Sequence, residues 1–555
     1  MALSGAEIVL ECLKEQGVKT IFGYPGGAML PLYDALYKYK KDFTHILTSH
    51  EQGATHAADG YARASGKVGV CFTTSGPGAT NAVTGIATAY MDSIPMVVFT
   101  GQVGTSLLGK DSFQEVDITA ITIPITKHNY IVRDIKDLSS TIKKAFKIAQ
   151  SDRPGPVLVD IPKDVLKDTL EFLEETDIVV NTLKEECSIQ KFIKAMEWID
   201  AAKQPVIYAG GGVISSNASQ ELYQFAIKEN IPVVNSLMGL GSFPRDHKLS
   251  LGMVGMHGLY EANMAVTNSD LVIAIGARFS DRVVGDAKKF AKNARIIHVD
   301  IDQAEISKNK DANLWLIGDI KKILTVFIKN AKFKKHDKWG NKIEQWKKKQ
   351  IKKEVGSFHP QKIIECAYEV VKGDAIVTTE VGQHQMWVAQ TWQFQKPRTF
   401  LTSGGLGTMG YGLGAAIGAK IANPQKTVLH FAGDGSFRMN LNELATVSKY
   451  NLPIITILMN NGTLGMVRQW QTIFYEKRYS ETDISNNIDY VSLAKSFGID
   501  GKRATDIDAF KQVLQEAIKE KRPMVIECVI DKDESVYPFV PAGKAIDEMI
   551  LETKK

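Results

Sequence analysis

Two stretches decide how this chain folds: Thr427-Val-Leu-His-Phe-Ala-Gly-Asp-Gly435 and Pro453-Ile-Ile-Thr-Ile-Leu-Met-Asn-Asn461. Each begins as a short apolar run, which is typical of a buried strand, and ends in polar residues. Asp434 and Asn461, delivered from the two strand ends, offer hard oxygen ligands that suit Mg²⁺, an ion that commonly bridges to phosphates. The glycines beside Asp434 let backbone N–H groups approach a diphosphate closely.

Short apolar strands alternate with helical patterns along most of the 555 residues. A chain of this length exceeds one hydrophobic core, so about three domains are expected. Alternation of this kind is typical of mainly parallel sheets covered by helices. We therefore predict an α/β fold with three doubly wound parallel-sheet domains. The predicted bounds of the three domains and of a C-terminal tail are 1–170, 190–330, 356–535 and 536–555.

The segments between these units lack strand patterns. Residues 163–190 carry Lys, Glu, Asp and Thr without a strong period, and we interpret them as a linker. Residues 332–354 are strongly basic and are interpreted as a solvated helix or connecting segment, because a phosphate-binding patch would need a fold to present it. The tail contains Pro538 and Pro541 and fits either a surface strap or an active-site lid.

Composition argues against several classes of protein. The formal net charge of +5 is small for this length and gives no case for nucleic-acid binding. The chain begins at once with a helical period, without the features of a signal peptide, and no apolar run approaches the ~20 residues that span a bilayer. We expect a cytoplasmic protein with reduced thiols and neither zinc nor disulfides. The cysteines are scattered: Cys12, Cys71, Cys187, Cys366 and Cys528.

One carboxyl group in the first unit is a candidate for acid–base chemistry. Glu51 follows the short strand Thr44–Ser49 and opens a helix with Ala, Gly and Tyr on one face. Alone, a Glu at a helix start is usually a favourable interaction with the helix dipole. However, the Gly-Asp-Gly and Asn-Asn pair looks like the signature of thiamine-diphosphate enzymes. Their chemistry needs a carboxyl group that hydrogen-bonds the aminopyrimidine ring and favours its imino tautomer, which removes the thiazolium C2 proton.

The glycine-rich stretch Ser403–Gly410 contains a formal GxGxxG motif from Gly405 to Gly410, which suggests dinucleotide binding. That interpretation is weak, because no clear strand precedes the motif and no acidic residue follows about 20 positions on in the right context. Met409 offers a better account. A bulky side chain wedged between the two rings of thiamine diphosphate would enforce the bent shape that brings base and carbon together. An ordinary core role for Met409 stays open.

With these residues in place, the chain resembles the acetohydroxyacid synthase (acetolactate synthase) large-subunit family over essentially its whole length. The resemblance implies thiamine diphosphate, Mg²⁺ and FAD as cofactors, and an active site between the first unit of one chain and the third unit of another. A homodimer or homotetramer follows, with a separate small regulatory subunit. The motifs that carry the resemblance are Phe22–Gly27, His50–Gly53, Thr74–Asn81, Phe113–Glu115, Arg153–Pro156, Gly276–Phe279 and Gly462–Trp470.

The resemblance also implies roles for matching positions, although most of them, taken singly, are equally explained as turns, core aromatics or surface polar residues. Mg²⁺ ligands are the side chains of Asp434 and Asn461 and the carbonyl of Thr463. Catalytic and substrate-side positions are Gly27, Glu51, Phe113, Gln114, Lys163 and Met409. Thiamine diphosphate contacts are Glu51, Val381, Gly382, Gln383, His384, Gly407, Met409, Gly433, Asp434, Gly435, Ser436, Asn461, Thr463, Gly465 and Met466. FAD contacts are Arg153, Gly210, Gly211, Gly212, Met256, His257, Gly276, Arg278, Arg282, Asp300, Ile301, Gly318 and Asp319.

Two positions refine this expectation. Trp470, with Met466 and Val467, matches the wall that shapes the pocket for the second 2-oxoacid in the biosynthetic members, although a methylene is worth only about 1–3 kcal/mol. Ser280 stands where many relatives carry Asp, which leaves flavin affinity open. Because the chemistry implied by the resemblance transfers no electrons, FAD would be structural.

The implied reaction is the decarboxylation of pyruvate and ligation of the hydroxyethyl unit to pyruvate or 2-oxobutyrate, the first common step of valine, leucine and isoleucine synthesis. The nearest alternatives are a pyruvate oxidase and a simple 2-oxoacid decarboxylase of the same cofactor family. A non-catalytic thiamine-binding subunit would be expected to lack Glu51, Asp434 or Asn461, which are all present. A flavin or nicotinamide oxidoreductase depends on the weak GxGxxG motif alone.

Overall fold

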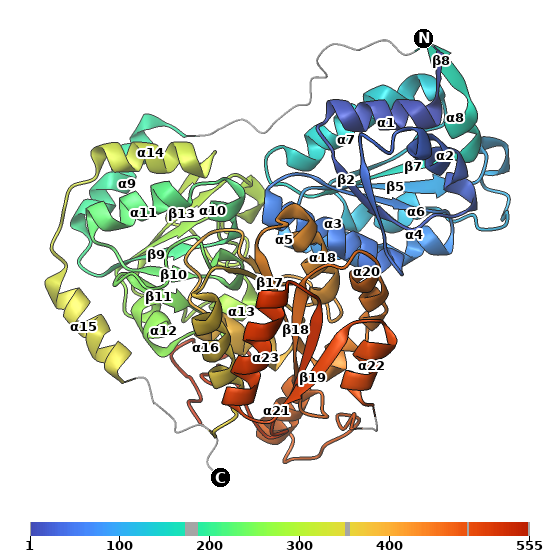
Figure 1. Cartoon of the computed structure of the whole chain (residues 1–555). Coiled ribbons are helices and arrows are strands. Elements are labelled where there is room, and N and C mark those ends of the chain that lie inside the picture. The colour runs from blue at the N-terminus through green and yellow to red at the C-terminus, as the bar shows by residue number, and fades with distance from the viewer. Residues whose placement is uncertain (1, 172–186, 350–355, 486–487, 553–555) are drawn as a thin grey trace.

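The computed structural model describes residues 2–171, 187–349, 356–485 and 488–552. Within these residues the chain forms three six-stranded sheets, each parallel throughout and covered by helices (Figure 1). A separate antiparallel pair, β1 (Ala2–Ser4) and β8 (Thr169–Glu171), joins the two ends of the first unit. The predicted α/β class with three parallel sheets is confirmed.

The first sheet separates two hydrophobic cores, because successive residues of a strand point to opposite faces. Val70 and Phe72 pack into one core. Cys71, between them, packs into the other core, which continues into the third unit. The strands in sheet order are β3 (Thr44–Leu47), β2 (Thr20–Gly23), β4 (Gly69–Thr73), β5 (Met96–Gln102), β7 (Pro156–Pro162) and β6 (His128–Ile131). Its helices are α1 (Gly5–Glu15), α2 (Leu30–Lys38), α3 (Glu51–Ser65), α4 (Pro77–Asn81), α5 (Val83–Asp92), α6 (Ile118–Thr122), α7 (Leu138–Gln150) and α8 (Lys163–Lys167).

Helix α3 joins the first unit to the third, because it packs directly against α18 (Gly412–Ala422) (Figure 1). The backbones approach so closely that a Cβ on Gly60 would lie 2.3 Å from the carbonyl oxygen of Ala415. A Cβ on Gly418 would clash with α3 in the same way. Only glycine allows this approach, so the small-residue face predicted for this helix is confirmed. The contact fixes the position of Glu51, the first residue of α3.

The middle sheet continues the same architecture. The strands in sheet order are β11 (Ser250–Met253), β10 (Val233–Asn235), β9 (Pro205–Ala209), β12 (Leu271–Ile275), β13 (Arg295–Asp300) and β14 (Leu314–Ile317). Its helices are α9 (Ile189–Ala201), α10 (Gly211–Ser215), α11 (Ser219–Glu229), α12 (Tyr260–Thr267), α13 (Asp281–Val284), α14 (Ile320–Asn330) and α15 (Asp337–Lys348), with the 3₁₀ turn η5 (Leu237–Gly239).

The third sheet contains the two stretches that open the sequence. They form β17 and β18, which are adjacent and parallel and pair through Gly433 and Met459, so Asp434 and Asn461 leave the sheet at one edge. The strands in sheet order are β16 (Phe400–Leu401), β15 (Ala375–Thr379), β17 (Thr427–Gly433), β18 (Ile454–Asn460), β20 (Met524–Val529) and β19 (Asp500–Ala504). Besides α18, its helices are α16 (Pro360–Val371), α17 (Gln383–Thr391), α19 (Asp434–Phe437), α20 (Leu444–Lys449), α21 (Gly465–Phe474), α22 (Tyr490–Ser496) and α23 (Ile507–Glu520).

Three predictions about local structure need correction: two concern connecting segments, and one concerns the GxGxxG motif. The linker predicted from residue 163 is wrong up to residue 171, because Val165 and Leu166 are buried and β8 pairs with β1; residues 172–186 lie outside the described residues. Within the basic segment, Asp337–Lys348 form α15, but Trp339 and Trp346 bury one face of it, so this helix is amphipathic rather than solvated all round; residues 350–354 lie outside the described residues. A short strand, β16, does precede the GxGxxG motif.

The C-terminal tail crosses the middle unit as a strap. The backbone N–H of Val540 donates to the Met256 carbonyl at 2.8 Å, and that of Asp286 donates to the Lys544 carbonyl at 2.9 Å. Phe539 is fully buried against Trp470 of α21. The tail therefore ties the middle unit to the third. No helix in the described part of the chain is both long and apolar enough to cross a bilayer.

A buried carboxyl group in the first sheet makes stability depend on pH. Asp160 accepts hydrogen bonds from Thr100 Oγ1 at 2.6 Å and Gln102 Nε2 at 3.0 Å. Burial nevertheless raises the pKa of Asp160 from 3.8 to about 7. The folded state therefore holds this proton more tightly than the unfolded chain. Its contribution to stability is complete below pH 3.8 and is lost as the pH rises through about 7.

We expect the variant Asp160→Asn, which cannot titrate, to gain stability relative to the native chain as the pH rises between these values. The gain is about 1.4 kcal/mol for each pKa unit of the shift. Urea unfolding of both proteins at pH 5 and pH 8 measures it. A difference in unfolding free energy that stays constant with pH would contradict the prediction.

Candidate active site

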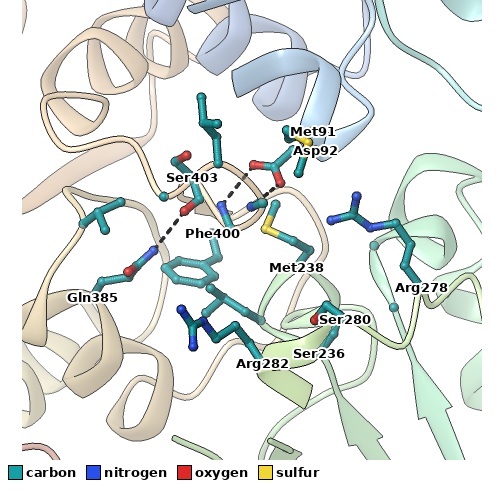
Figure 2. Close-up of a pocket in the computed structure, with 18 of the residues that line it drawn as sticks. Met91, Asp92, Ser236, Met238, Arg278, Ser280, Arg282, Gln385, Phe400 and Ser403 are labelled. Carbon is teal, nitrogen blue, oxygen red and sulfur yellow. Dashed lines mark hydrogen bonds between the residues drawn. The ribbon is translucent and has the colours of Figure 1, made fainter. Parts of the chain in front are cut away.

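A single cavity of about 1380 Å³ lies where the three units meet. This volume exceeds that of a usual pocket for one small molecule, about 300–1,000 Å³. The first unit contributes the end of α5, and the middle unit contributes loops that follow its strands (Figure 2). The third unit contributes helix starts and most of the stretch Ser403–Met409. Ligands of doubly wound sheets bind at this kind of edge, beyond the carboxyl ends of the strands.

Asp434 provides a buried anionic oxygen in this cavity. Its side chain is 1% exposed, and its Oδ2 has no hydrogen-bond partner among the described residues. Burial raises the pKa of Asp434 to about 6, although Arg438, whose Nη2 lies 3.8 Å from Oδ2, opposes the shift. Asn461 and Thr463 line the same part of the cavity. These oxygen donors fit a Mg²⁺ ion, which would satisfy the orphaned carboxylate oxygen.

Three helices, α17, α19 and α21, begin beside this carboxylate, and their first residues line the cavity. The backbones are tightly packed: a Cβ on Gly433 would lie 2.9 Å from His384 Nδ1, and one on Gly465 would lie 2.0 Å from Gln383 Oε1. Burial lowers the pKa of His384 to about 4, and its Nε2 has no hydrogen-bond partner in the part of the chain described. Helix starts and a neutral imidazole suit a diphosphate.

The third unit brings together its predicted thiamine and specificity positions. Met409 and Trp470 line the same cavity as Asp434. The Trp470 ring packs against Phe539 of the tail at 5.9 Å between centroids. The lining from this unit includes Val381, Gly382, Gln383, His384, Gly407, Met409, Gly433, Asp434, Gly435, Ser436, Asn461, Thr463, Gly465, Met466, Val467 and Trp470.

The middle unit lines the same cavity with most of the predicted FAD positions. Gly212 and Gly276 follow β9 and β12, and a Cβ on Gly212 would lie 2.6 Å from the Gly276 Cα, so the backbone approaches as closely as a diphosphate requires. Asp300 ends β13, and burial raises its pKa to about 6. The lining also includes Arg153, Gly210, Gly211, Met256, His257, Arg278, Arg282, Ile301 and Asp319, whereas Gly318 is outside the lining drawn from the described residues.

Arg153 already has protein partners. Its guanidinium donates to Asp302 at 3.1 Å and to Glu305 at 2.7 Å, and its Nε donates to the Ser93 hydroxyl. The side chain thereby connects the first unit to the middle unit. If Arg153 also contacts a flavin, it does so while it holds this interdomain ion pair. The sequence pattern did not indicate the ion pair.

The predicted catalytic positions of the first unit lie elsewhere. Among the described residues, the cavity lining contains none of Gly27, Glu51, Phe113, Gln114 and Lys163. Within one chain, the candidate acid–base residue and the candidate metal site are therefore in different places.

Glu51 lies in a separate cluster on the first unit. Its side chain is 8% exposed, and Asn81 Nδ2 donates to Glu51 Oε2 at 3.0 Å. A Cβ on Gly78 would lie 3.1 Å from Glu51 Oε1, so the glycine leaves this oxygen accessible. Thr74 nearby is buried, and its hydroxyl has no hydrogen-bond partner within the described ranges. We call Glu51, Thr74 and Asn81 the glutamate cluster.

Large apolar side chains are exposed on the first unit, and one of them, Phe113, lies close to this cluster. Gln114 adopts a positive φ of 60°, and its backbone packs against Gly76, which follows Thr74 closely in sequence. Phe113 beside it is 88% exposed, which is rare for a phenylalanine. Leu30 and Ile123 of the same unit are also exposed. Where exposed apolar side chains gather into one patch, they mark a surface for another protein.

Sequence reasoning missed several residues that shape the cavity. Asp92 and Met91 end α5, Met238 belongs to η5, and Arg398 precedes β16. Arg398 donates to carbonyl groups of the first and middle units. None of these four residues belongs to a recognisable sequence motif. An isolated Asp, Met or Arg has many structural explanations, so the sequence alone offers no reason to select them.

Three parallel-sheet units and one shared cavity, with a buried Asp and a half-buried Asn beside glycine-rich helix starts, define the class of thiamine-diphosphate (thiamine pyrophosphate) enzymes. Three family models match the chain in order. The thiamine pyrophosphate enzyme N-terminal TPP binding domain matches residues 3–121, the central domain matches 192–327 and the C-terminal TPP binding domain matches 380–528.

Individual relatives narrow the class. The chain is 47% identical over 567 residues to the acetolactate synthase large subunit of Buchnera aphidicola subsp. Schizaphis graminum, covering 100% of this chain and 99% of that protein. It is 44% identical to the acetolactate synthase large subunit of Haemophilus influenzae, covering 99% and 98%. Acetolactate synthase isozyme 3 large subunit of Escherichia coli K12 is 44% identical, with the same coverage. The chain belongs to the acetolactate synthase large-subunit family, as its sequence motifs predict.

Proposed function

We propose that this enzyme decarboxylates one pyruvate and joins the remaining two-carbon unit to a second 2-oxoacid. Two pyruvates and one proton give 2-acetolactate and CO₂, and 2-oxobutyrate as acceptor gives 2-aceto-2-hydroxybutyrate. One observation carries the proposal: the orphaned Asp434 carboxylate, three helix starts, Met409 and Trp470 share a single cavity. Membership of the acetolactate synthase family supports this choice over a pyruvate oxidase or a simple decarboxylase.

The third unit would hold the cofactor and its metal. Thiamine diphosphate, when bound, supplies a carbon nucleophile and an electron sink for decarboxylation. Asp434 and Asn461 would ligate Mg²⁺ through side-chain oxygens, and Thr463 would ligate it through its carbonyl. The starts of α17 and α21, with His384, would neutralise the diphosphate.

Glu51 would supply the acid–base group from a second copy of the chain. Its hydrogen bond from Asn81 holds one carboxyl oxygen, which leaves the other free to exchange a proton with the aminopyrimidine nitrogen. Gln114, Phe113, Gly27 and Lys163 would line the substrate side from the same copy. We therefore propose a homodimer, alone or within a homotetramer, in which one copy covers the exposed Phe113 and the glutamate cluster of the other.

The middle unit would bind FAD in a structural role, because the proposed reaction transfers no electrons. Its glycines would receive the diphosphate, and Asp300 at the end of β13 would receive a ribose hydroxyl. We propose the domain bounds 1–170 for the pyrimidine-binding unit, 190–330 for the FAD-binding unit and 356–535 for the diphosphate-binding unit. A cytoplasmic location and a separate small regulatory subunit complete the proposal.

Trp470 would select the second substrate, since a flat indole wall contacts the extra methyl group of 2-oxobutyrate. We expect Trp470→Leu to lower the preference for 2-oxobutyrate over pyruvate by about 10- to 100-fold, the value of one well-packed methylene contact. Product ratios from mixtures of the two acceptors measure this preference. Trp198→Leu, which removes an indole from the middle unit, is the control, and an unchanged ratio in Trp470→Leu would remove the specificity role.

Product identification tests the proposed reaction. The purified protein is incubated with pyruvate, thiamine diphosphate, Mg²⁺ and FAD, with and without 2-oxobutyrate. Acetolactate alone, and a mixed product when 2-oxobutyrate is present, support the proposal. Acetaldehyde as the main product indicates a simple decarboxylase, and acetate with reduced flavin or peroxide indicates an oxidase.

A further inference from the structure

The stretch Ser403–Gly410, here called the glycine loop, belongs to the third unit but lies between the other two. The end of α5 flanks one side of it, and Met238 flanks the other (Figure 2). A Cβ on Gly404 would lie 2.3 Å from Met238 Sδ, and one on Gly405 would lie 2.8 Å from Asp92 Oδ1. The first and middle units therefore clamp the loop that carries Met409.

Asp92 makes the polar half of this clamp. Its Oδ2 accepts the backbone N–H of Gly404 at 3.0 Å, and its Oδ1 accepts that of Gly405 at 2.7 Å, as the dashed lines of Figure 2 show. Arg63 Nη2 donates to Oδ2 at 2.9 Å, and the Asp92 side chain has 0% exposure. Because Asp92 is the last residue of α5, the helix dipole opposes a negative charge there, and these donors offset that cost.

Arg63 and its partners hold the chain on both sides of the glycine loop. Arg63 Nη1 donates to the carbonyl of Thr402, immediately before the loop, at 2.9 Å. Arg63 Nε donates to Asp59 at 2.6 Å, and Asp59 in turn accepts the hydroxyl of Tyr411, immediately after the loop, at 2.6 Å. A buried ion cluster of α3 and α5 thus fixes both ends of a loop from another unit.

The far end of the loop is held as firmly. Thr88 of α5 and Thr408 share a hydrogen bond of 2.8 Å between hydroxyl groups. The N–H of Gly410 donates to the buried Glu380 at 2.7 Å. Met409 lies between these two anchored residues, so its backbone has little freedom to choose the direction of its side chain.

We propose that Asp92 is a positioning residue for the thiamine reaction, which fixes the glycine loop and so holds Met409 at the cavity wall, where its side chain would support the bent cofactor. This inference rests on the proposed function. It assigns to the first unit a second contribution to catalysis, made within the same chain as the metal site, besides the one expected from Glu51 of another copy. A displacement of about 1 Å at such a support can cost 10²-fold in rate.

The test compares Asp92→Asn with Asp270→Asn. Asp270 is a matched control, because its carboxylate also accepts two consecutive backbone N–H groups, those of Lys203 at 2.7 Å and Gln204 at 2.9 Å. It is absent from the cavity lining drawn from the described residues. The primary readout needs no substrate: the rate of hydrogen–deuterium exchange at the thiazolium C2 of the bound cofactor, followed by quenched-flow NMR. Steady-state kcat and KM for pyruvate are measured alongside.

We expect Asp92→Asn to slow C2 exchange and kcat by a similar factor, about 10- to 100-fold, with KM for pyruvate changed by less than about twofold. Asp270→Asn should leave all three values unchanged. In a Met409→Ala background, Asp92→Asn should have little further effect on exchange, because both changes remove the same constraint. If Asp92 had only a structural role, the factors by which Asp92→Asn and Met409→Ala slow C2 exchange would multiply in the double variant.

Wild-type exchange in Asp92→Asn, or full additivity with Met409→Ala, would overturn the proposal. If Asp92→Asn does not fold, Asp92→Glu keeps the charge beside Arg63 and displaces the loop by one methylene, and the same comparison with Met409→Ala decides. A native protein that does not accelerate C2 exchange over the free cofactor would overturn the proposed function together with this inference. Normal exchange in the native protein and in Asp92→Asn would remove the positioning role alone.

Discussion

Asp434→Ala should abolish detectable activity and weaken Mg²⁺ binding by more than about 100-fold, beyond the 10- to 100-fold cost of losing an outer-shell partner. Asp434 is the one carboxylate among the three proposed ligands, so the variant loses the negative charge that attracts the cation. The diphosphate should bind weakly as well, since the metal would bridge it to the protein. Calorimetric titration of the variant with Mg²⁺ and thiamine diphosphate measures both losses.

Asp506→Ala is the control for this prediction. Asp506 caps α23 in the same unit, where its carboxylate accepts the N–H of Ala509 at 2.8 Å. Losing that cap costs about 1 kcal/mol of stability and should leave cofactor binding intact. Undiminished Mg²⁺ and thiamine diphosphate affinity in Asp434→Ala would show that the cation binds elsewhere.

Glu51→Ala should reduce kcat by about 10²- to 10⁴-fold, the usual cost of losing an acid–base group. The affinity for Mg²⁺ should change little, because Glu51 lies outside the cavity that Asp434 lines in one chain. Glu51→Gln should be nearly as impaired, since an amide keeps the hydrogen-bonding shape but cannot exchange a proton. Steady-state kinetics with saturating cofactor, together with the C2 exchange rate, measure the loss.

The alternative for Glu51 is a favourable contact with the helix dipole, and Glu7→Ala separates the two. Glu7 lies in the first turn of α1, where it completes a capping box with Ser4. Both variants should lose stability in this way, by about 1 kcal/mol or less. Only Glu51→Ala should lose turnover. Near-normal turnover in that variant would remove Glu51 from the mechanism.

Local patterns predicted the fold well, because most of the central β-strands are short apolar runs between polar turns, such as β5 and β12. The two stretches that open the sequence form neighbouring strands, and the juxtaposition of Asp434 and Asn461 follows directly from parallel pairing. The close packing of the small-residue face of α3 was also predictable, since only small residues allow two helices to approach so closely.

Long-range features could not be predicted in the same way. The contacts of Asp92 and Arg63 join residues more than three hundred positions apart, and no spacing within the sequence encodes such a pair. The segment after residue 162 was misjudged because its two buried residues, Val165 and Leu166, are too few to establish a period. Which chain completes the site around Glu51 is a property of assembly, and it entered only through the family resemblance.

Activity in mixtures of two inactive variants tests most directly whether Glu51 of one chain serves Asp434 of another. Glu51→Ala and Asp434→Ala carrying different affinity tags are dissociated, mixed in equal amounts and reassociated, and two-step purification verifies the mixed dimers. A mixed dimer with sites shared between chains has one site with both native residues. The unfractionated mixture should therefore recover about one quarter of native activity. If both residues act within one chain, neither site is intact, and activity no higher than that of the separate variants would contradict the account.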